Sequence, residues 1–282
     1  MNTEIWPAPA KINLFLHVLG RREDGYHSLQ TAFQFLDYCD ELQFKANNRG
    51  EIRRQASYQG VAEADDLVVK AASLLRDKSG ADFGVTIDIN KRLPMGGGLG
   101  GGSSDAATTL VALNQLFELG QTVDELAELG LKLGADVPVF VRGRAAWAEG
   151  VGELLTPIEV DEDSYLVVWP DCHVNTAAVF AADDLTRNTP AITIRDFRAG
   201  AGHNDCEKVV SRLHPEVSEV LDYLNQDYEA RMTGTGACVY ARFAKLADAE
   251  EAAQKLPGGW QHFVARGLNT SPLMVRLDSG QN

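Results

Sequence analysis

The strongest chemical signal in the sequence is a glycine-rich stretch that could bind phosphate. It reads Pro94, Met95, Gly96, Gly97, Gly98, Leu99, Gly100, Gly101, Gly102, Ser103 and Ser104, and a helix pattern follows it directly. Glycine accepts positive φ angles and lets backbone N–H groups approach a ligand closely, while the helix adds its N-terminal dipole. The stretch therefore predicts an anion site, in which the serines offer hydroxyls to phosphate oxygens or to a magnesium ion. The alternative, a plain linker, fits poorly between a strong strand pattern and a strong helix pattern.

Two other phosphate-binding motifs do not explain this stretch. A Walker-A loop needs a lysine after its glycines, and none follows here. Gly96, Gly98 and Gly101 have the spacing of the dinucleotide fingerprint, but such a match is nearly automatic in a run of glycines. That fingerprint also needs an acidic residue at the end of a second strand about twenty residues further on. Here residues 115–118 lie within or at the end of a helix pattern.

Three polar residues stand in apolar surroundings where they could act on a hydroxyl group. Lys11 and Asn13 interrupt an apolar strand pattern and, on strict alternation, project from the same face. They could orient a hydroxyl and hold phosphoryl oxygens; the alternative is a solvated strand face. Asp136 lies between a helix end and an apolar run, where its carboxylate could accept a proton from a substrate hydroxyl. The alternative for Asp136 is a simple helix N-cap.

Two turn-like segments could complete a binding site. Asp24 and Gly25 form a turn that precedes Tyr26, which can stack on a base, and His27, which can hydrogen-bond to a base edge. A hairpin turn with surface aromatics explains the same residues equally well. The second segment, residues 232–237, is glycine-rich and precedes a strand pattern. It could close over a phosphate, or it could be a tight turn.

The elements that must position these residues are strands and helices mixed along both halves of the chain. In the first half, strands are predicted at 11–18, 31–36, 41–45 and 85–90. Three helices are predicted there: one at 66–77, a second that directly follows the glycine-rich stretch, and a third from 122 to 134. In the second half, strands are predicted at 165–170, 239–243 and 262–266, and helices at 207–213, 217–224 and 247–256. The mixture predicts an α+β fold with two domains, residues 1–155 and 156–282.

Composition and charge narrow the classes of function. The 282 residues are 45% hydrophobic and 23% charged, which is typical of a globular protein and excludes a disordered or coiled-coil chain. The net charge of −14 argues against nucleic acid and membrane surfaces as partners. The absence of a signal-peptide pattern and of a membrane-spanning run predicts a cytoplasmic protein. The four cysteines form no C-x-x-C pair, which argues against a structural zinc site.

Taken together, these segments resemble the GHMP kinase superfamily of small-molecule kinases. The phosphate-binding motif of the superfamily matches residues 94–104, and its C-terminal glycine motif matches residues 232–238. Further segments resemble one branch, which phosphorylates the 2-hydroxyl of 4-diphosphocytidyl-2-C-methyl-D-erythritol with ATP in the non-mevalonate isoprenoid pathway. These segments are residues 9–14, 22–27, 134–138 and 204–207, in the expected order.

The resemblance implies a two-domain α+β kinase with its active site in the cleft between the domains. It implies that Asp136 is the general base and that Lys11 stabilises the ionised hydroxyl and the migrating phosphoryl group. The implied substrate-binding residues are Asn13 as a positioning group, Tyr26 and Phe180 stacked on cytosine, His27 at the cytosine edge, and Phe33 and Thr176 in the same pocket. Residues 94–104 are implied to hold ATP. Mg²⁺ is the implied cofactor, and the sequence leaves its ligands unknown.

One position departs from the pattern of the family. Asp66 stands where the family usually has an asparagine that can contact adenosine, so the acceptor oxygen is kept and the amide donor is lost. Two other functions stay open. One is another small-molecule kinase of the superfamily, with Tyr26 and His27 merely structural, and the other is a nucleotide-binding regulator without catalysis. We expect a small-molecule substrate and a monomer or homodimer.

Overall fold

The computed structural model describes residues 4–55 and 61–279, so the outer ends of the two predicted domains lie outside the described residues. The strands are β1 (Trp6–Arg21), β2 (His27–Asn47), β3 (Ile52–Arg54), β4 (Gly84–Asn90), β5 (Ala146–Glu149), β6 (Leu154–Pro157), β7 (Ser164–Trp169), β8 (Ala230–Met232), β9 (Val239–Phe243) and β10 (Gln261–Leu268). The helices are α1 (Leu67–Ser79), α2 (Gly101–Leu116), α3 (Val123–Leu131), α4 (Val137–Arg142), α5 (Thr176–Ala181), α6 (Ile194–Arg198), α7 (Asp205–Leu213), α8 (Pro215–Leu224), α9 (Leu246–Gln254) and α10 (Pro272–Ser279), with a short 3₁₀ turn at Glu63–Asp65.

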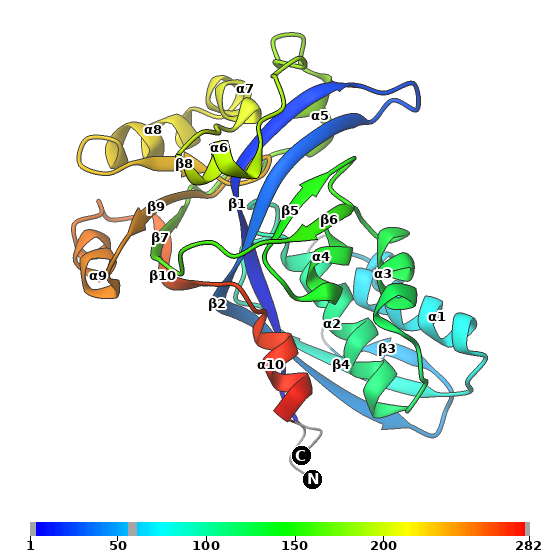
Figure 1. Cartoon of the computed structure of the whole chain (residues 1–282). Coiled ribbons are helices and arrows are strands. Elements are labelled where there is room, and N and C mark those ends of the chain that lie inside the picture. The colour runs from blue at the N-terminus through cyan, green and yellow to red at the C-terminus, as the bar shows by residue number, and fades with distance from the viewer. Residues whose placement is uncertain (1–3, 56–60, 280–282) are drawn as a thin grey trace.

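The long antiparallel pair β1–β2 runs through the middle of the molecule (Figure 1). The two strands are joined by a tight turn in which Gly25 has a φ of 87°, a value that glycine adopts without strain. The register of the pair shifts on either side of the segment from Lys11 to Asn13. Such irregularities re-aim side chains locally, and this one lies at the two polar residues of β1 that the sequence singled out.

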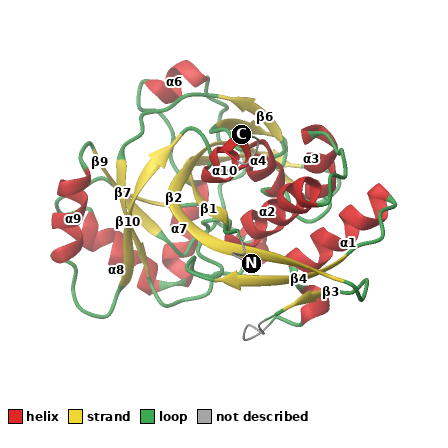
Figure 2. Ribbon diagram, turned by 90° about the horizontal axis from the view of Figure 1, so that it is seen from below, coloured by secondary structure: helices red, strands yellow, loops and turns green. Residues whose placement is uncertain are grey.

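The strands form one mixed sheet in the order β3-β4-β2-β10-β7-β9-β8, with β1 and β5 also paired to β2. Helices α1 to α4 gather on one side of the β1–β2 pair, and α8 and α9 lie on the other side (Figure 2). Each group covers its own apolar core, one around α1 to α4 and one around α7 to α9. The predicted α+β class is therefore confirmed, with two helical layers built on a shared sheet.

The two halves of the chain are interleaved at the sheet. Leu16 and Val18 of β1 pack into the core around α7 to α9, while Leu273 of α10 packs into the core around α1 to α4. Strand β10 pairs with β2 as well as with β7. The division predicted at residue 155 stays a prediction.

Most predicted elements are present, but several differ in extent; the strand predicted at 11–18, for example, spans Trp6–Arg21. The capping box of Thr122 and Glu125 is formed at the start of α3. The strands predicted at 31–36 and 41–45 are wrong as separate elements, since β2 is continuous and Cys39 and Asp40 between them are paired with β1. Helix α2 begins at Gly101, inside the glycine run, because the preceding turn supplies the left-handed residue at its N-cap. Among the described residues, no helix is long and apolar enough to span a membrane.

Candidate active site

A cavity of about 610 Å³ is lined by residues from both halves of the chain. The predicted site residues that line it are Lys11, Asn13, Phe33, Pro94, Met95, Gly96, Gly97, Gly98, Gly100, Gly101, Gly102, Ser103, Asp136, Thr176 and Phe180. The predicted site residues that lie outside this lining are Tyr26, His27, Leu99 and Ser104. The fold thus brings the glycine-rich stretch, the polar residues of β1 and the first turn of α5 to one cavity.

Lys11 lies at the meeting point of the groups that could act on a hydroxyl. Its side chain is 3% exposed, and its Nζ donates hydrogen bonds to Asn13 Oδ1 at 2.7 Å and to the carbonyl oxygen of Gly98 at 3.0 Å. The same Nζ lies 3.2 Å from Asp136 Oδ2 and 5.3 Å from the centre of the Phe33 ring. Lys11 and Asn13 are both buried, so the alternative of a solvated strand face is excluded.

Asp136 stands at the N-cap position of α4, but its side chain makes no capping hydrogen bond. The helix that follows is fixed by a run of buried apolar residues from Val137 to Val141. The Asp136 side chain is 36% exposed and lines the cavity, while Lys11 behind it is almost fully buried. The carboxylate is therefore accessible to a molecule in the cavity and is held there by the Lys11 ammonium group.

The glycine-rich stretch needs glycine for two physical reasons. Gly96, Gly98 and Gly100 adopt φ angles of 71°, 76° and 74°, in the left-handed region that other residues rarely occupy. A Cβ atom on Gly98 would lie 2.2 Å from the carbonyl oxygen of Thr233, in the second glycine-rich segment. The two segments therefore pack backbone against backbone, and a side chain at position 98 would push them apart.

Hydrogen bonds hold the second glycine-rich segment in place. The Nδ2 of Asn204 donates to the carbonyl oxygens of Met232 and Gly234, both at 2.8 Å. The backbone N–H of Cys238 donates to the carbonyl oxygen of Gly97 at 3.1 Å. The segment at 232–238 is thus a fixed wall of the cavity, which places the glycine turn 234–236 opposite the glycine-rich stretch.

The two serines at the start of α2 have different surroundings. Ser103 lines the cavity. Ser104 is fully buried, and its Oγ has no hydrogen-bond partner among the described residues. Leu99 is also buried, within an apolar cluster, and its carbonyl oxygen accepts a hydrogen bond from the Lys11 backbone at 3.0 Å. Leu99 and Ser104 therefore do not face the cavity but are buried on the other side of the glycine-rich stretch, where they support it.

Aromatic and basic groups meet beside α5. The His27 ring stacks on the Phe180 ring at 5.1 Å, and Arg187 Nε donates to His27 Nε2 at 3.2 Å. Burial and the nearby Arg187 guanidinium lower the pKa of His27, which favours the neutral ring. Tyr26 is 66% exposed in the hairpin turn. Thr176 shares a hydrogen bond of 2.8 Å with Thr235, which joins α5 to the second glycine-rich segment.

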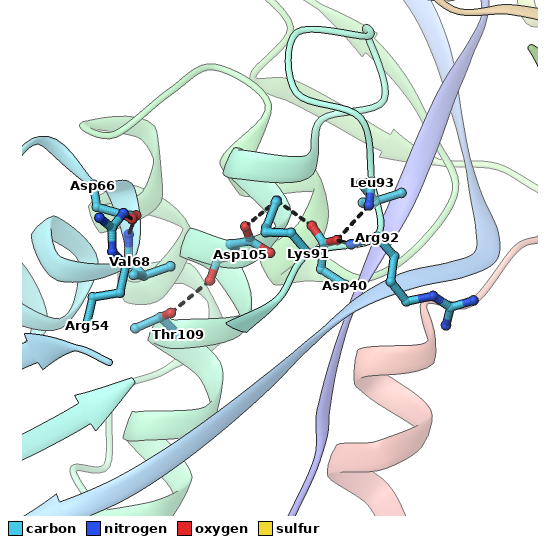
Figure 3. Close-up of polar contacts among 9 residues, drawn as sticks. All are labelled: Asp40, Arg54, Asp66, Val68, Lys91, Arg92, Leu93, Asp105 and Thr109. Atoms are coloured by element: carbon cyan, nitrogen blue, oxygen red, sulfur yellow. Dashed lines mark hydrogen bonds and ion pairs between the residues drawn. The ribbon is translucent and has the colours of Figure 1, made fainter. Parts of the chain in front are cut away.

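A buried charged cluster behind the glycine-rich stretch was missed by the sequence analysis. Lys91 Nζ hydrogen-bonds to the carboxylates of Asp40 and Asp105, and Asp40 also accepts the backbone N–H groups of Arg92 and Leu93 (Figure 3). Burial raises the pKa of Asp105 to about 7, against the opposing effect of the Lys91 charge. Asp40 therefore anchors the segment that leads into the glycine-rich stretch, while Lys91 lines the cavity.

The negative charge of Asp66, the residue that departs from the family pattern, is balanced by a positive charge within the chain. One carboxylate oxygen pairs with the buried Arg54 guanidinium, and the other accepts the backbone N–H of Val68 at 3.1 Å (Figure 3). Asp66 thereby caps α1 with its side chain. Its extra negative charge is neutralised by Arg54, a relationship that no local sequence pattern indicates.

Comparisons with known proteins agree with this geometry. The family model for the GHMP kinase N-terminal domain matches residues 66–144, and that for the GHMP kinase C-terminal domain matches residues 186–262. The chain is 56% identical over 275 residues to the 4-diphosphocytidyl-2-C-methyl-D-erythritol kinase of Ectopseudomonas mendocina (strain ymp), covering 98% of this chain and 94% of the relative. It is 55% identical to the enzyme of that name from Pseudomonas aeruginosa (strain LESB58), covering 97% of each.

Solved structures extend the likeness to the fold. The crystal structure of a 4-(cytidine 5'-diphospho)-2C-methyl-D-erythritol kinase superposes with a TM-score of 0.82 at 33% identity, covering 94% of this chain and 99% of the other. The mevalonate kinase of Methanococcus jannaschii superposes with a TM-score of 0.67 at 16% identity, covering 95% of this chain and 99% of the other, and shows the shared fold alone. Full-length identity above 50% and both domain matches lead to one conclusion: the chain belongs to the GHMP kinases, in the family of 4-diphosphocytidyl-2-C-methyl-D-erythritol kinases.

Proposed function

We propose that this protein transfers the γ-phosphoryl group of ATP to the 2-hydroxyl of 4-diphosphocytidyl-2-C-methyl-D-erythritol, with Asp136 as the general base and Lys11 as its partner. The observation that carries the proposal is the Lys11–Asp136 pair, 3.2 Å apart, in the cavity lined by the glycine-rich stretch. Membership of the family supports the choice of acceptor. The product is an intermediate of isoprenoid precursor synthesis by the non-mevalonate pathway.

The proposed roles follow from where the two charged groups stand. As the 2-hydroxyl oxygen bonds to the γ-phosphorus and the bond to ADP breaks, Asp136 accepts the hydroxyl proton. Lys11 opposes the negative charge that develops on the attacking oxygen and on the migrating phosphoryl group. Its ammonium group is held by Asn13 and by the Gly98 carbonyl, so it needs little reorganisation during the reaction. Because the acceptor hydroxyl is tertiary and hindered, orientation contributes strongly.

The donor nucleotide is proposed to lie along residues 94–104. The N-terminus of α2, a helix of 16 residues, offers backbone N–H groups without intrahelical partners to the phosphates. Mg²⁺, when bound beside the phosphates, would offset their negative charge. Ser103 has the oxygen donor that this hard cation prefers and lines the cavity, which favours it over the buried Ser104 as the hydroxyl near the cation.

The cytosine end of the acceptor is proposed to bind beside α5. Phe180 lines the cavity, and its ring, whose centre lies 5.1 Å from that of the His27 ring, is proposed to stack on the cytosine. In its neutral form His27 accepts from Arg187 at Nε2 and carries its proton on Nδ1, which suits it to a cytosine acceptor atom. Tyr26 would swing from the exposed turn to the opposite face of the base, and Phe33, Thr176 and Asn13 complete the pocket.

A panel of acceptors tests the proposed function. The purified protein with Mg-ATP is supplied in turn with 4-diphosphocytidyl-2-C-methyl-D-erythritol, mevalonate, homoserine and galactose, and ADP release is followed in each case. We expect turnover with the cytidylated alcohol only. Preference for another acceptor would select a different small-molecule kinase of the superfamily, and no turnover with any of them would favour a non-catalytic regulator.

Three properties stay predictions. They are a cytoplasmic location, a monomeric or homodimeric state, and the absence of nucleic acid and membrane partners. The predicted domain division at residue 155 belongs with them.

A further inference from the structure

A second cluster of reactive side chains lies outside the cavity. Cys172 belongs to the loop between β7 and α5, His214 joins α7 to α8, and Glu216 is the second residue of α8. One ligand atom from each, a thiol sulfur, a ring nitrogen and a carboxylate oxygen, lie within 4.8 Å of one another. The α5, α7 and α8 helices lie together in the same upper part of the molecule (Figure 1). Two separate segments of the chain, the loop between β7 and α5 and the corner between α7 and α8, thus converge on one point.

The three ligand atoms are available. No hydrogen bond or ion pair from the described residues reaches the Cys172 sulfur, the ring nitrogens of His214 or the Glu216 carboxylate. Cys172 and His214 are half-buried, whereas Glu216 is exposed. Exposed carboxylates often lie near other polar groups without a ligand. Cys172 and His214 keep partial access to solvent, so an ion can reach their ligand atoms.

The donor set matches the preferences of a thiophilic divalent cation. Zinc takes thiolate, imidazole and carboxylate ligands at about 2.0–2.3 Å in tetrahedral geometry, which sets ligand atoms roughly 3.3–3.7 Å apart. The present ligand atoms lie within 4.8 Å of one another, and the exposed Glu216 side chain can change its rotamer to approach the other two. Three protein ligands leave the fourth position to water. Hard cations such as Mg²⁺ reject the thiolate in favour of oxygen ligands.

We propose that Cys172, His214 and Glu216 form a binding site for one Zn²⁺ ion, separate from the cavity. The proposal departs from the expectation, based on cysteine spacing, that the chain has no structural zinc site, because only one cysteine contributes and His214 and Glu216 supply the other ligands. Bound zinc would tie the loop between β7 and α5 to the α7–α8 corner. A chain with zinc bound in this way is more stable than the same chain without it, since the ion binds the folded arrangement only.

The site is linked to the cavity through the neighbours of Cys172. A Cβ atom on Gly96 would lie 2.6 Å from Nδ1 of His173, so the His173 ring rests directly on the glycine-rich stretch. Asn175 caps α5 with its side chain, and Thr176 and Phe180 of that helix line the cavity. Zinc binding therefore holds in place the loop that contacts both the glycine-rich stretch and α5.

Metal titration of the reduced protein tests the site directly. After chelator treatment, the full chain is titrated with Co²⁺, whose bond to a thiolate gives a charge-transfer band in the near ultraviolet, and then with Zn²⁺ in competition. We expect one ion per chain, a thiolate band, and a rise of the Tm with Zn²⁺. The Cys172→Ser variant should lose the band, and His214→Gln and Glu216→Gln should each weaken binding at least about tenfold.

Matched substitutions separate this site from adventitious binding. His262→Gln and Asp222→Asn change exposed groups elsewhere, at β10 and further along α8, and should bind Co²⁺ and Zn²⁺ as the unmodified chain does. A missing thiolate band in the unmodified chain, a band that survives Cys172→Ser, or binding that ignores His214→Gln would each overturn the proposal. The titration needs no nucleotide, so its result is independent of the kinase assay. Unaltered far-ultraviolet circular dichroism identifies variants that are folded.

Discussion

The ammonium nitrogen of Lys11 lies 3.2 Å from a carboxylate oxygen of Asp136, although the two residues belong to β1 and to the start of α4. The pair is asymmetric: Lys11 is 3% exposed and Asp136 is 36% exposed. The cation is thus fixed from behind by protein acceptors, while the carboxylate faces the cavity. This arrangement suits a base that works on a bound hydroxyl, with a positive charge held next to the developing oxyanion.

Substitution of Asp66 by asparagine should destabilise the fold. Asparagine keeps the oxygen that caps α1 but removes the negative charge that faces the Arg54 guanidinium, whose side chain is 3% exposed. Loss of one partner from a buried pair costs about 3 kcal/mol. Urea unfolding of Asp66→Asn measures this loss. Asp65→Asn is the matched control, because Asp65 is 75% exposed and its pair with Lys70 is a surface pair that contributes roughly 0–1 kcal/mol. Equal stability of the two variants would contradict the role of the Arg54–Asp66 pair.

The buried cluster of Lys91, Asp40 and Asp105 predicts a pH dependence. The pKa of Asp105 is raised by burial from 3.8 to about 7, so between these values the folded chain keeps a proton that the unfolded chain has lost. The stability that Asp105 contributes is therefore present below about pH 4 and falls as the pH rises through 7. Asp105 Oδ1 accepts no hydrogen bond among the described residues, whereas Asp40 Oδ1 accepts two from backbone N–H groups.

The measurement compares the unmodified chain with Asp105→Asn, in which this proton equilibrium is removed. From pH 4 to pH 8 the unmodified chain should lose free energy of unfolding relative to the variant, on the order of 2–4 kcal/mol. Subtracting the two curves cancels groups that titrate alike in both proteins. A difference that stays flat over this range, or that grows in favour of the unmodified chain, would show that Asp105 is ionised throughout.

Residues that depend on local pattern were predictable, and residues that depend on distant contacts were not. The glycine-rich stretch, the polar positions of β1 and the capping box of Thr122 and Glu125 each leave a mark within a few residues. Lys91, Asp40 and Asp105 come from three separate segments, so nothing in their spacing indicates that they meet. Continuity of β2 also depends on tertiary pairing, here of Cys39 and Asp40 with β1, which local strand propensity does not reveal.

Alanine at position 98 should damage both the fold and ATP turnover. Alanine would be strained in the left-handed backbone of Gly98, and its Cβ atom would lie 2.2 Å from the Thr233 carbonyl oxygen. Together these two effects should lower the free energy of unfolding by about 3 kcal/mol. Gly120→Ala is the control, since Gly120 has a φ of 68° with no atom within 4 Å of an added Cβ. The free energy of unfolding of Gly120→Ala should fall by only about 1 kcal/mol. If thermal unfolding shows the two variants to be alike, the backbone packing of the two glycine-rich segments is not important for stability.

Tyr26 should contribute to acceptor binding and little to the fold. It is 66% exposed, so its removal leaves no cavity in a core. Tyr26→Ala should raise the KM for the cytidylated acceptor by the equivalent of about 1–3 kcal/mol, the value of stacking on a base, with the KM for ATP unchanged. Tyr26→Phe keeps the ring and should behave as the unmodified enzyme does. An acceptor KM that is the same in all three proteins argues against stacking.

The general-base role of Asp136 is tested most directly by the kcat of Asp136→Asn with saturating Mg-ATP and 4-diphosphocytidyl-2-C-methyl-D-erythritol. Asparagine has nearly the shape of aspartate but accepts no proton, so kcat should fall about 10²–10⁴-fold while the Kd for a non-hydrolysable ATP analogue stays the same. Asp124→Asn, at an exposed carboxylate that pairs with Arg142 outside the cavity lining, should keep full activity. An Asp136→Asn enzyme with undiminished kcat would contradict the account.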